Sequence, residues 1–177
     1  MASVRAFRPL LRPAPRIAAR ATQQQARFLN WETSPPFYTA HASVTGGRKG
    51  KISAENLDIQ LAAPKELGGP GKLYRNGSNP EELFAAGYGA CFQGAMAATA
   101  PSLNIKLPED SVIETKVHLI GDVKKLDMGI RVDMKIKFGS GISKADAEKV
   151  VEKTKEVCPY SIATQGNVVT NTEVIIG

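Results

Sequence analysis

Hydrophobic and charged residues alternate most regularly in the segment IRVDMKIKF, residues 130–138. A period of two predicts a β-strand with one face against a core and the other in water. Weaker patterns predict four further strands, bounded by glycine-rich or charged turns. These cover residues 37–45, 51–61, 111–121 and 167–176. The turn GGRKG joins the first two, and GDVKKLDMG is expected to form a hairpin connection before IRVDMKIKF.

A helix is predicted between two well-defined end signals. Asn79 is a suitable N-cap, Pro80 fits the first helical position, and Glu82 occupies the capping-box position. The helix is expected to end near Ala100, because Pro101 prevents its continuation. Its body has little polar face, which indicates a buried helix. The Ala- and Gly-rich composition argues against a membrane span.

A second helix is predicted over residues 144–157, with Ser143 as N-cap and Asp146 three residues later. Pro159 ends this helix, because proline cannot continue one. The segment 64–78, PKELGGPGKLYRNGS, is predicted as a loop. The order strands, helix, strands, helix, strand predicts an α+β fold with an antiparallel sheet, not a doubly wound one.

The beginning of the chain is rich in arginine and has no acidic residue before Glu32. The six arginines are Arg5, Arg8, Arg12, Arg16, Arg20 and Arg27. This pattern predicts that residues 1–29 are a mitochondrial transit peptide, which places the mature protein in the mitochondrion, in its matrix. The alternative is a basic arm that binds nucleic acid or a membrane surface.

The net charge follows the same division of the chain. Lys and Arg total 23 against 17 Asp and Glu, a net charge of +6. The six arginines account for all of this excess, so residues 30–177 have no net positive field for nucleic acid. These roughly 148 residues suit a single domain with a hydrophobic core. Two cysteines are too few for a disulfide framework.

The two cysteines are Cys91, within the small-residue helix, and Cys158, after the second helix. One interpretation makes both buried structural thiols, since free cysteine is among the most buried residue types. A chemical role would require a cation that stabilises a thiolate, and Arg48 in the GGRKG turn is a candidate, with Glu81 as its carboxylate partner. Ten residues of straight helix separate Glu81 from Cys91 by ~15 Å. An arginine must therefore lie between them, or the residues must meet across a subunit interface.

Other kinds of site find little support in the sequence. His41 and His118 are too few and too scattered for a metal cluster of recognised spacing. Either histidine would serve a Cys/His hydrolase if it lay within hydrogen-bond reach of Cys91, and this alternative stays open. The sequence contains no P-loop, dinucleotide fingerprint or nucleophile elbow.

Three segments, YTAHASVTGGRKG, NPEELFAAGYGACF and VCPYSIATQGNV, resemble the signature segments of the organic hydroperoxide resistance proteins. These proteins form the Ohr branch of the Ohr/OsmC family of thiol peroxidases. The resemblance covers roughly residues 37–176. It implies that Cys91 is the peroxidatic cysteine and Cys158 the resolving cysteine. It also implies that Arg48 is the catalytic arginine and that Glu81 is its carboxylate partner.

The resemblance also implies a fold, a reaction and partners. The expected fold is an intertwined homodimer with antiparallel sheets wrapped around two long central helices and active sites at the subunit interface. The expected reaction reduces alkyl or fatty-acyl hydroperoxides through a Cys91 sulfenate and a Cys91–Cys158 disulfide. No bound cofactor or metal is expected, and dihydrolipoamide or lipoylated proteins of dehydrogenase complexes would act as reductant. The alternatives are an OsmC-like peroxidase, a redox sensor, or a hydrophobic ligand binder on the same fold.

Overall fold

The computed structural model describes residues 29–70 and 77–177. The predicted transit peptide lies almost entirely outside the described residues, so it stays a prediction. The chain divides into two compact units, residues 1–39 and 40–177. All the elements described below belong to the second unit.

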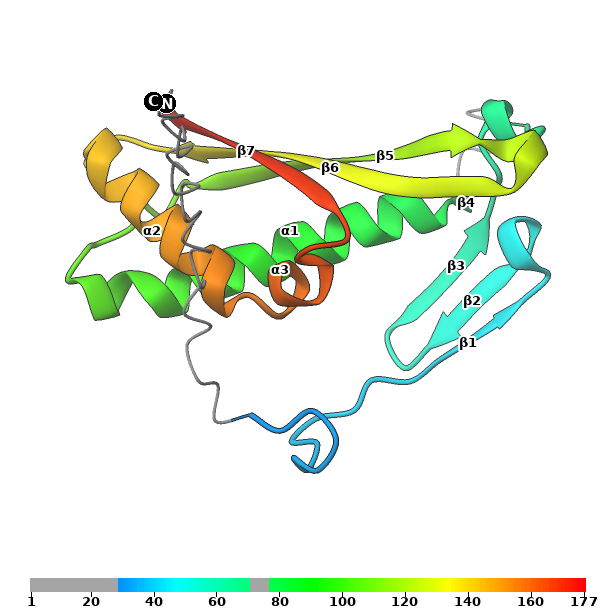
Figure 1. The fold of residues 1–177 in the computed structure, drawn as a ribbon, viewed down its shortest axis with the longest axis horizontal. Coiled ribbons are helices and arrows are strands. Elements are labelled where there is room, and N and C mark those ends of the chain that lie inside the picture. The colour runs from blue at the N-terminus through cyan, green and yellow to red at the C-terminus, as the bar shows by residue number, and fades with distance from the viewer. Residues whose placement is uncertain (1–28, 71–76) are drawn as a thin grey trace, which may run out of the picture. The chain divides into compact units, whose positions relative to one another are not determined.

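The first sheet follows directly on the start of the second unit (Figure 1). Its strands, paired in chain order, are β1 (Ala42–Thr45), β2 (Lys51–Ala54), β3 (Leu57–Leu61) and β4 (Gly77–Ser78). The turn between β1 and β2 contains the short 3-10 helix η1 (Gly47–Lys49). The β1–β2 and β2–β3 pairs are antiparallel, whereas β3 and β4 run parallel.

Two strand predictions for this sheet are wrong in extent. The predicted strand 37–45 begins only at Ala42, because its partner strand ends opposite it at Ala54. The predicted strand 51–61 is two strands, because the chain reverses at Glu55 and Asn56, and asparagine is a common turn residue. The predicted loop 64–78 contains the 3-10 helix η2 (Lys65–Leu67) and ends in β4, and its residues 71–76 lie outside the described part.

The second sheet carries the alternating pattern that the sequence shows most clearly. Its strands, in spatial order, are β5 (Val112–Asp122), β6 (Asp127–Phe138) and β7 (Val169–Ile176). The β5–β6 pair is an antiparallel hairpin closed by the short 3-10 helix η5 (Val123–Lys125), as predicted. The predicted antiparallel pairing holds for β5 and β6, whereas β6 and β7 are parallel, so the sheet is mixed. Parallel neighbours require a crossover connection, and the helices between β6 and β7 supply it.

The long helix α1 (Pro80–Thr99) has the predicted boundaries. The Asn79 side chain accepts a hydrogen bond from the backbone N–H of Glu82 at 2.8 Å, and proline occupies the first helical position. The chain continues past Thr99 as the 3-10 helix η4 (Ala100–Leu103). None of the helices that the structure describes is long and apolar enough to cross a membrane.

Two helices form the crossover between β6 and β7. The first, α2 (Lys144–Val157), is capped as predicted, since the Ser143 hydroxyl accepts the backbone N–H of Asp146 at 3.1 Å. The second, α3 (Pro159–Thr164), was not predicted. Proline ends α2, yet its fixed φ and missing N–H suit the first position of a new helix. Cys158 therefore lies at the junction, as C-cap of α2 and N-cap of α3.

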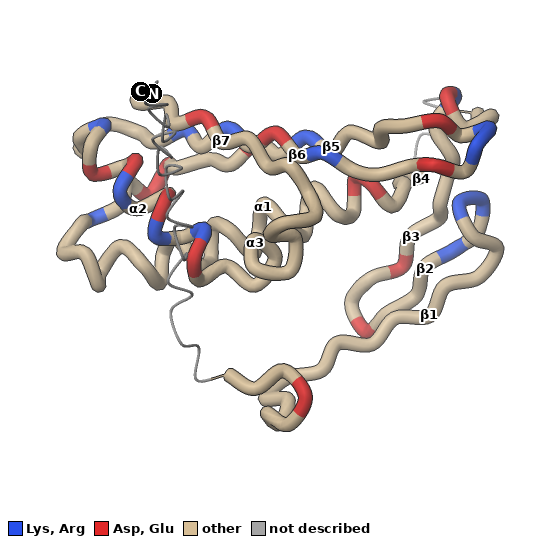
Figure 2. Tube along the Cα trace, in the orientation of Figure 1, with Lys and Arg blue, Asp and Glu red and all other residues tan. Residues whose placement is uncertain are grey.

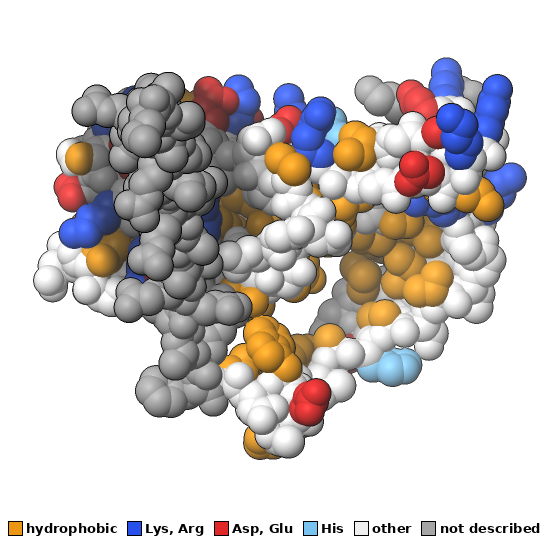
Figure 3. All heavy atoms as spheres, viewed as in Figure 1, with side chains coloured by type: hydrophobic (Ala, Val, Ile, Leu, Met, Phe, Trp, Pro, Cys, Tyr) orange, Lys and Arg blue, Asp and Glu red, His pale blue; other side chains and the backbone are white. Residues whose placement is uncertain are grey.

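The hydrophobic core lies between the helices and one face of the second sheet (Figure 1). Alternate residues of β6 point into it, as the period of two predicts, and α1 and α2 supply the opposing side chains. Its members include Val132, Met134, Ile136 and Phe138 of β6, Tyr88, Phe92 and Met96 of α1, and Ala147, Val150 and Val151 of α2. Lys, Arg, Asp and Glu residues occur along the same sheet (Figures 2 and 3).

Candidate functional site

Arg48 and Glu81 form a bidentate ion pair across 33 positions of the chain. Arg48 Nη1 donates to Glu81 Oε2 at 2.8 Å, and Nη2 donates to Oε1 at 2.7 Å. The Arg48 side chain is 38% exposed and that of Glu81 only 16%. The hydrogen bond from the guanidinium lowers the pKa of the Glu81 carboxyl against the opposing effect of its burial. The pair thus fixes an oriented, permanently charged guanidinium beside the first turn of α1.

Glycines set the turn that presents Arg48. Gly46 caps η1 in the left-handed region at φ 68°, a conformation that glycine adopts without steric cost. At Gly50, a Cβ atom would lie 1.6 Å from the carbonyl oxygen of Thr45, so no other residue fits this turn. The GGRKG segment is therefore a tight loop that holds one half-buried arginine against the first turn of α1.

Cys91 and Cys158 form a second pair, of two free thiols. Their Sγ atoms lie 3.6 Å apart, although the residues are 67 positions apart in sequence. Cys158 is fully buried at the α2–α3 junction, whereas Cys91, in the middle of α1, is only partly buried. A disulfide requires an S–S distance of about 2 Å, which a small local movement would supply.

The surroundings of Cys91 within one chain do not favour its thiolate. Burial raises the pKa of the Cys91 thiol above its ordinary value. The backbone N–H of Tyr160 opposes this rise, and the Cys158 thiol adds to it. Among the described residues, none of the groups that act on this pKa is a cation. The cation that a reactive thiolate requires therefore does not come from this chain's own described surroundings.

The four predicted residues are thus brought together as two pairs rather than as one cluster. Glu81 lies in the first turn of α1 and Cys91 ten residues later, a distance of ~15 Å along the helix axis. Within residues 29–70 and 77–177, no hydrogen bond or ion pair of the structure links the Arg48–Glu81 pair to the cysteines.

Three aromatic rings contact one another near Cys91, two from the preceding turns of α1 and one from α3. The Phe84 and Tyr88 rings are 5.9 Å apart at 86°, and the Tyr160 ring lies 6.1 Å from Phe84 and 5.9 Å from Tyr88. Phe84 and Tyr88 were not predicted as site residues, although their spacing of seven and three residues before Cys91 places them on its face of the helix. Phe92, beside Cys91 in sequence, is buried in the core instead.

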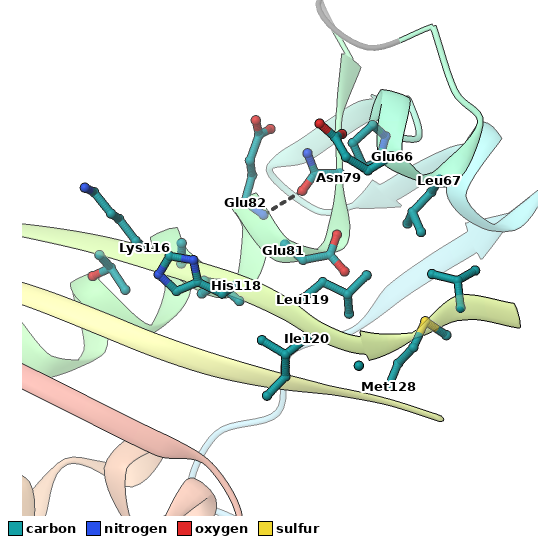
Figure 4. Close-up of a pocket in the computed structure, with 16 residues that line it drawn as sticks. Glu66, Leu67, Asn79, Glu81, Glu82, Lys116, His118, Leu119, Ile120 and Met128 are labelled. Atoms are coloured by element: carbon teal, nitrogen blue, oxygen red, sulfur yellow. Dashed lines mark hydrogen bonds between the residues drawn. The ribbon is translucent and has the colours of Figure 1, made fainter. Parts of the chain in front are cut away.

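A cavity of about 660 Å³ is lined by Glu81 and by residues of β5 (Figure 4). Glu81 extends into it, and Leu67, Leu119 and Met128 border the space. Neither cysteine lines it. The lining includes successive residues of β5, which is an edge strand of its sheet. This cavity therefore adjoins Glu81 and an edge strand of the second sheet, not the thiols.

The two histidines do not assist either cysteine. His118 Nε2 contacts Asp133 Oδ2 at 2.9 Å, and Asn171 donates to the other oxygen of that carboxylate at 2.8 Å. His41 precedes β1 and is exposed. No hydrogen bond among the described residues joins a histidine to Cys91, so the geometry of a Cys/His hydrolase is not present there. The described residues also contain no group of three His, Cys, Asp or Glu side chains placed to hold a metal ion.

A family model described as OsmC-like protein matches residues 69–173, which is more than half of the chain. The chain is 47% identical over 133 residues to an organic hydroperoxide resistance protein of Xanthomonas axonopodis pv. citri (strain 306), an alignment that covers 74% of this chain and 89% of the relative. The chain belongs to the Ohr/OsmC family. The resemblance drawn from the three sequence segments is confirmed.

Other members of the Ohr/OsmC family agree in sequence and in fold. The organic hydroperoxide resistance protein OhrA of Bacillus subtilis (strain 168) is 37% identical over 144 residues, or 80% of this chain and 98% of the relative. The crystal structure of an organic hydroperoxide resistance protein from Legionella pneumophila matches with a TM-score of 0.71 at 38% identity, over 80% of this chain and 99% of that one. The structure of OhrB of Bacillus subtilis matches with a TM-score of 0.69 at 35% identity, over 78% and 99%. The α+β fold of the Ohr/OsmC family is therefore confirmed.

Proposed function

We propose that this protein is a cysteine-based peroxidase that reduces organic hydroperoxides and serves in the response to oxidative stress. The observation that carries the proposal is the pair of free thiols, Cys91 and Cys158, held 3.6 Å apart in a chain of the Ohr/OsmC family. The partly buried thiol and the fully buried thiol suit different roles. Cys91 is the one a peroxide reaches, and Cys158 is protected until Cys91 has been oxidised.

The proposed cycle has three balanced steps. The Cys91 thiolate attacks the terminal oxygen of ROOH, the O–O bond breaks, and the alkoxide takes a proton and leaves as ROH. Cys91 is then a sulfenic acid, and the Cys158 sulfur attacks it, so that an S–S bond forms and water leaves with the Cys158 proton. A dithiol reduces this disulfide by thiol–disulfide exchange and becomes a disulfide itself.

A homodimer is part of this proposal, because one chain supplies only half of the site. The Cys91 thiol needs a cation, and the Arg48 guanidinium of its own chain is paired with Glu81 at the other end of the ~15 Å helical span. A second copy would bring its guanidinium to the thiol. In support, all four residues of β1 are exposed in the single chain, as are the apolar side chains of Val44, Leu57 and Met128.

The reductant and the location are proposed on the sequence. A dihydrolipoyl dithiol, free or on a lipoylated protein of a dehydrogenase complex, would reopen the disulfide. The arginine-rich residues 1–29 support a mitochondrial location, and lipoylated complexes occur in that compartment. An apolar surface beside the thiols would favour an alkyl or fatty-acyl hydroperoxide over hydrogen peroxide.

The test is steady-state peroxide consumption by the full-length chain. Cumene and linoleic acid hydroperoxides are compared with hydrogen peroxide, and dihydrolipoamide with thioredoxin and glutathione. We expect turnover of the organic peroxides with dihydrolipoamide and loss of turnover in Cys91→Ser. In Cys158→Ser we expect one reaction per chain, followed by sulfinic acid formation on Cys91, which mass spectrometry detects.

The outcomes separate the proposed peroxidase from the alternatives. Full activity in Cys91→Ser would contradict the peroxidase mechanism. Turnover by wild type with a different reductant or with hydrogen peroxide would favour an OsmC-like peroxidase. Oxidation of Cys91 that no dithiol reverses would favour a sensor, and the absence of oxidation in a folded protein would favour a ligand binder.

A further inference from the structure

The Tyr160 side chain occupies an unusual position beside the thiol pair. Tyr160 is the second residue after Cys158, at the start of α3, and its backbone N–H acts on the Cys91 thiol. Its ring lies over Gly87, where a Cβ would stand 3.3 Å from both Cε2 and Oη of the tyrosine. Gly87 precedes Cys91 by four residues, one turn or ~6 Å along the same helix face. The ring therefore covers the helix surface directly N-terminal to the reactive thiol.

The other two rings hold Tyr160 in this position. Tyr88 is 2% exposed, and its hydroxyl bonds to Ser161 Oγ at 3.1 Å, which ties α3 to α1. Phe84 and Tyr88 both lie within ring-contact distance of Tyr160. Tyr160 itself remains 40% exposed. Of the three rings it is thus the one that is fixed on one side and open to a ligand on the other.

The buried surroundings of Cys91 restrict where the organic group of a bound peroxide can lie. The side of Cys158 is fully buried, and the preceding turn of α1 on the same helix face carries the aromatic rings. A peroxide whose terminal oxygen meets the Cys91 sulfur must place its carbon substituent along an accessible surface. One such apolar surface is the Tyr160 ring, which is 40% exposed and covers Gly87, one helical turn before Cys91.

We infer that Tyr160 is a specificity-determining residue, whose ring binds the organic group of the hydroperoxide while its oxygen end reacts at Cys91. The inference rests on the proposed peroxidase function and deepens it. The ring and not the hydroxyl is the contact, since apolar and aromatic groups associate through ring area and quadrupole. Hydrogen peroxide has no organic group and gains nothing from this surface. Gly87 is part of this proposed binding surface, because a side chain at position 87 would occupy the space of the Tyr160 ring.

The experiment measures a single turnover without added reductant. Reduced full-length protein is mixed with cumene hydroperoxide or hydrogen peroxide, quenched with an alkylating agent at set times, and its remaining thiols are counted. Tyr160→Leu removes the ring, Tyr160→Phe is the matched control that keeps it, and Gly87→Leu displaces the ring while leaving it in the chain. We expect Tyr160→Leu and Gly87→Leu to lower the cumene-to-hydrogen-peroxide rate ratio by about 5- to 10-fold, and Tyr160→Phe to retain it.

Each result decides the inference. An equal loss of rate with both peroxides in Tyr160→Leu and Gly87→Leu would overturn it and assign the ring a purely structural role. An unchanged ratio in either folded variant would also overturn it, as would a collapse of the ratio in Tyr160→Phe. If Tyr160→Leu fails to fold, Gly87→Leu decides alone, since leucine suits a helix better than glycine. Wild-type protein that reacts with neither peroxide contradicts the proposed function itself, which is a different outcome.

Discussion

At the residue scale, the Arg48–Glu81 pair links charge, stability and reactivity. The guanidinium lowers the pKa of the Glu81 carboxyl. A carboxyl with a lowered folded-state pKa contributes stability above its unfolded pKa, and this contribution is lost as the pH falls through the folded value. At neutral pH the pair is therefore fully formed. The same ion pair leaves one guanidinium edge free to face an anion such as a thiolate.

Replacement of Arg48 is expected to change the pH dependence of the first reaction step. A cation lowers a thiol pKa, so Arg48→Gln should raise the pKa of Cys91 in the assembled protein and reduce the thiolate fraction at neutral pH. We expect the neutral-pH rate of Cys91 oxidation by cumene hydroperoxide to fall by up to about 10-fold per unit of pKa rise, with recovery at alkaline pH. The measurement is the rate of thiol loss as a function of pH.

Lys49→Gln is the matched control for this variant, because Lys49 is the exposed basic neighbour of Arg48 on the same turn. It should leave the profile unchanged. Arg48→Lys keeps the charge but cannot form the bidentate pair with Glu81, so an intermediate profile is expected. An Arg48→Gln profile that coincides with wild type would show that Arg48 does not act on Cys91.

Some site residues could be predicted from local sequence signals, and others could not. Cys91 and Cys158 were identifiable because a chain with only two cysteines and three family segments limits the choices. Phe84 and Tyr88 were missed, because aromatic residues at helical spacing usually indicate only a core face. Their role as a support for Tyr160 depends on contacts between α1 and α3 that no local pattern encodes.

At the element scale, local signals placed the ends of both long helices correctly. Asn79 and Ser143 each accept a backbone N–H from the third helical residue, which is the geometry that their positions predicted. The strand β6 also formed as its alternation required. These elements are determined within a few residues of themselves, so sequence pattern suffices for them.

Loss of the α2 cap is expected to destabilise the fold without touching the site. Ser143→Ala removes the acceptor for the Asp146 N–H, which should lower the free energy of unfolding by about 1 kcal/mol. Chemical denaturation monitored by circular dichroism measures this change. Ser140→Ala is the control, since Ser140 is exposed and lies in the preceding turn. An equal effect of the two substitutions would argue against the cap.

The structure differs from the predictions in the direction of one strand pair and in where two strands begin or end. β7 runs parallel to β6 because α2 and α3 return the chain to the same end of the sheet. The turn at Glu55 and Asn56 divides the predicted strand 51–61 into β2 and β3. α3 begins at Pro159, where the sequence indicated only an end. The direction of β7 depends on the packing of the crossover helices, whereas Asn56 as a turn residue and Pro159 as a first helical residue are local signals that the prediction did not use.

At the scale of the whole molecule, the Arg48–Glu81 pair is separated from the Cys91–Cys158 pair. Arg48 and Glu81 lie at one end of α1 and the thiols near its middle. A rigid helix cannot bring them together within one chain, since ten residues fix ~15 Å along its axis. A two-fold homodimer would supply each thiol with the arginine of the other subunit, because an isologous interface places both copies in equivalent positions.

A subunit-mixing experiment tests this composite site. Cys91→Ser chains are expected to be inactive alone, and Arg48→Gln chains to have strongly reduced turnover at neutral pH. In a mixed dimer, the intact Cys91 of one chain would meet the intact Arg48 of the partner subunit and form one working site. Random mixing of equal amounts should therefore restore about a quarter of wild-type peroxide turnover per chain. Co-expression or refolding of the two chains, followed by the steady-state assay, gives this value.

The control for mixing is a pair of variants in which each chain lacks one of the two thiols that a single site requires. Cys158→Ser chains mixed with Cys91→Ser chains should not recover turnover, because both thiols belong to one chain. Light scattering establishes in parallel that the wild type is a dimer. A monomeric active protein, or mixed dimers without recovered activity, would contradict the shared site.

The sequence by itself determined the helix boundaries, the alternating strand β6 and the candidate residues Arg48, Glu81, Cys91 and Cys158. Caps, periodicity and residue chemistry act over a few positions, so they can be read without a fold. Only the tertiary structure decided that Cys91 lies 3.6 Å from Cys158, that β7 runs parallel to β6, and that Tyr160 covers Gly87. These relations join segments about 40 to 70 positions apart. They depend on how helices and sheets pack, and the hydrophobic effect that drives packing is non-directional and leaves no local signature.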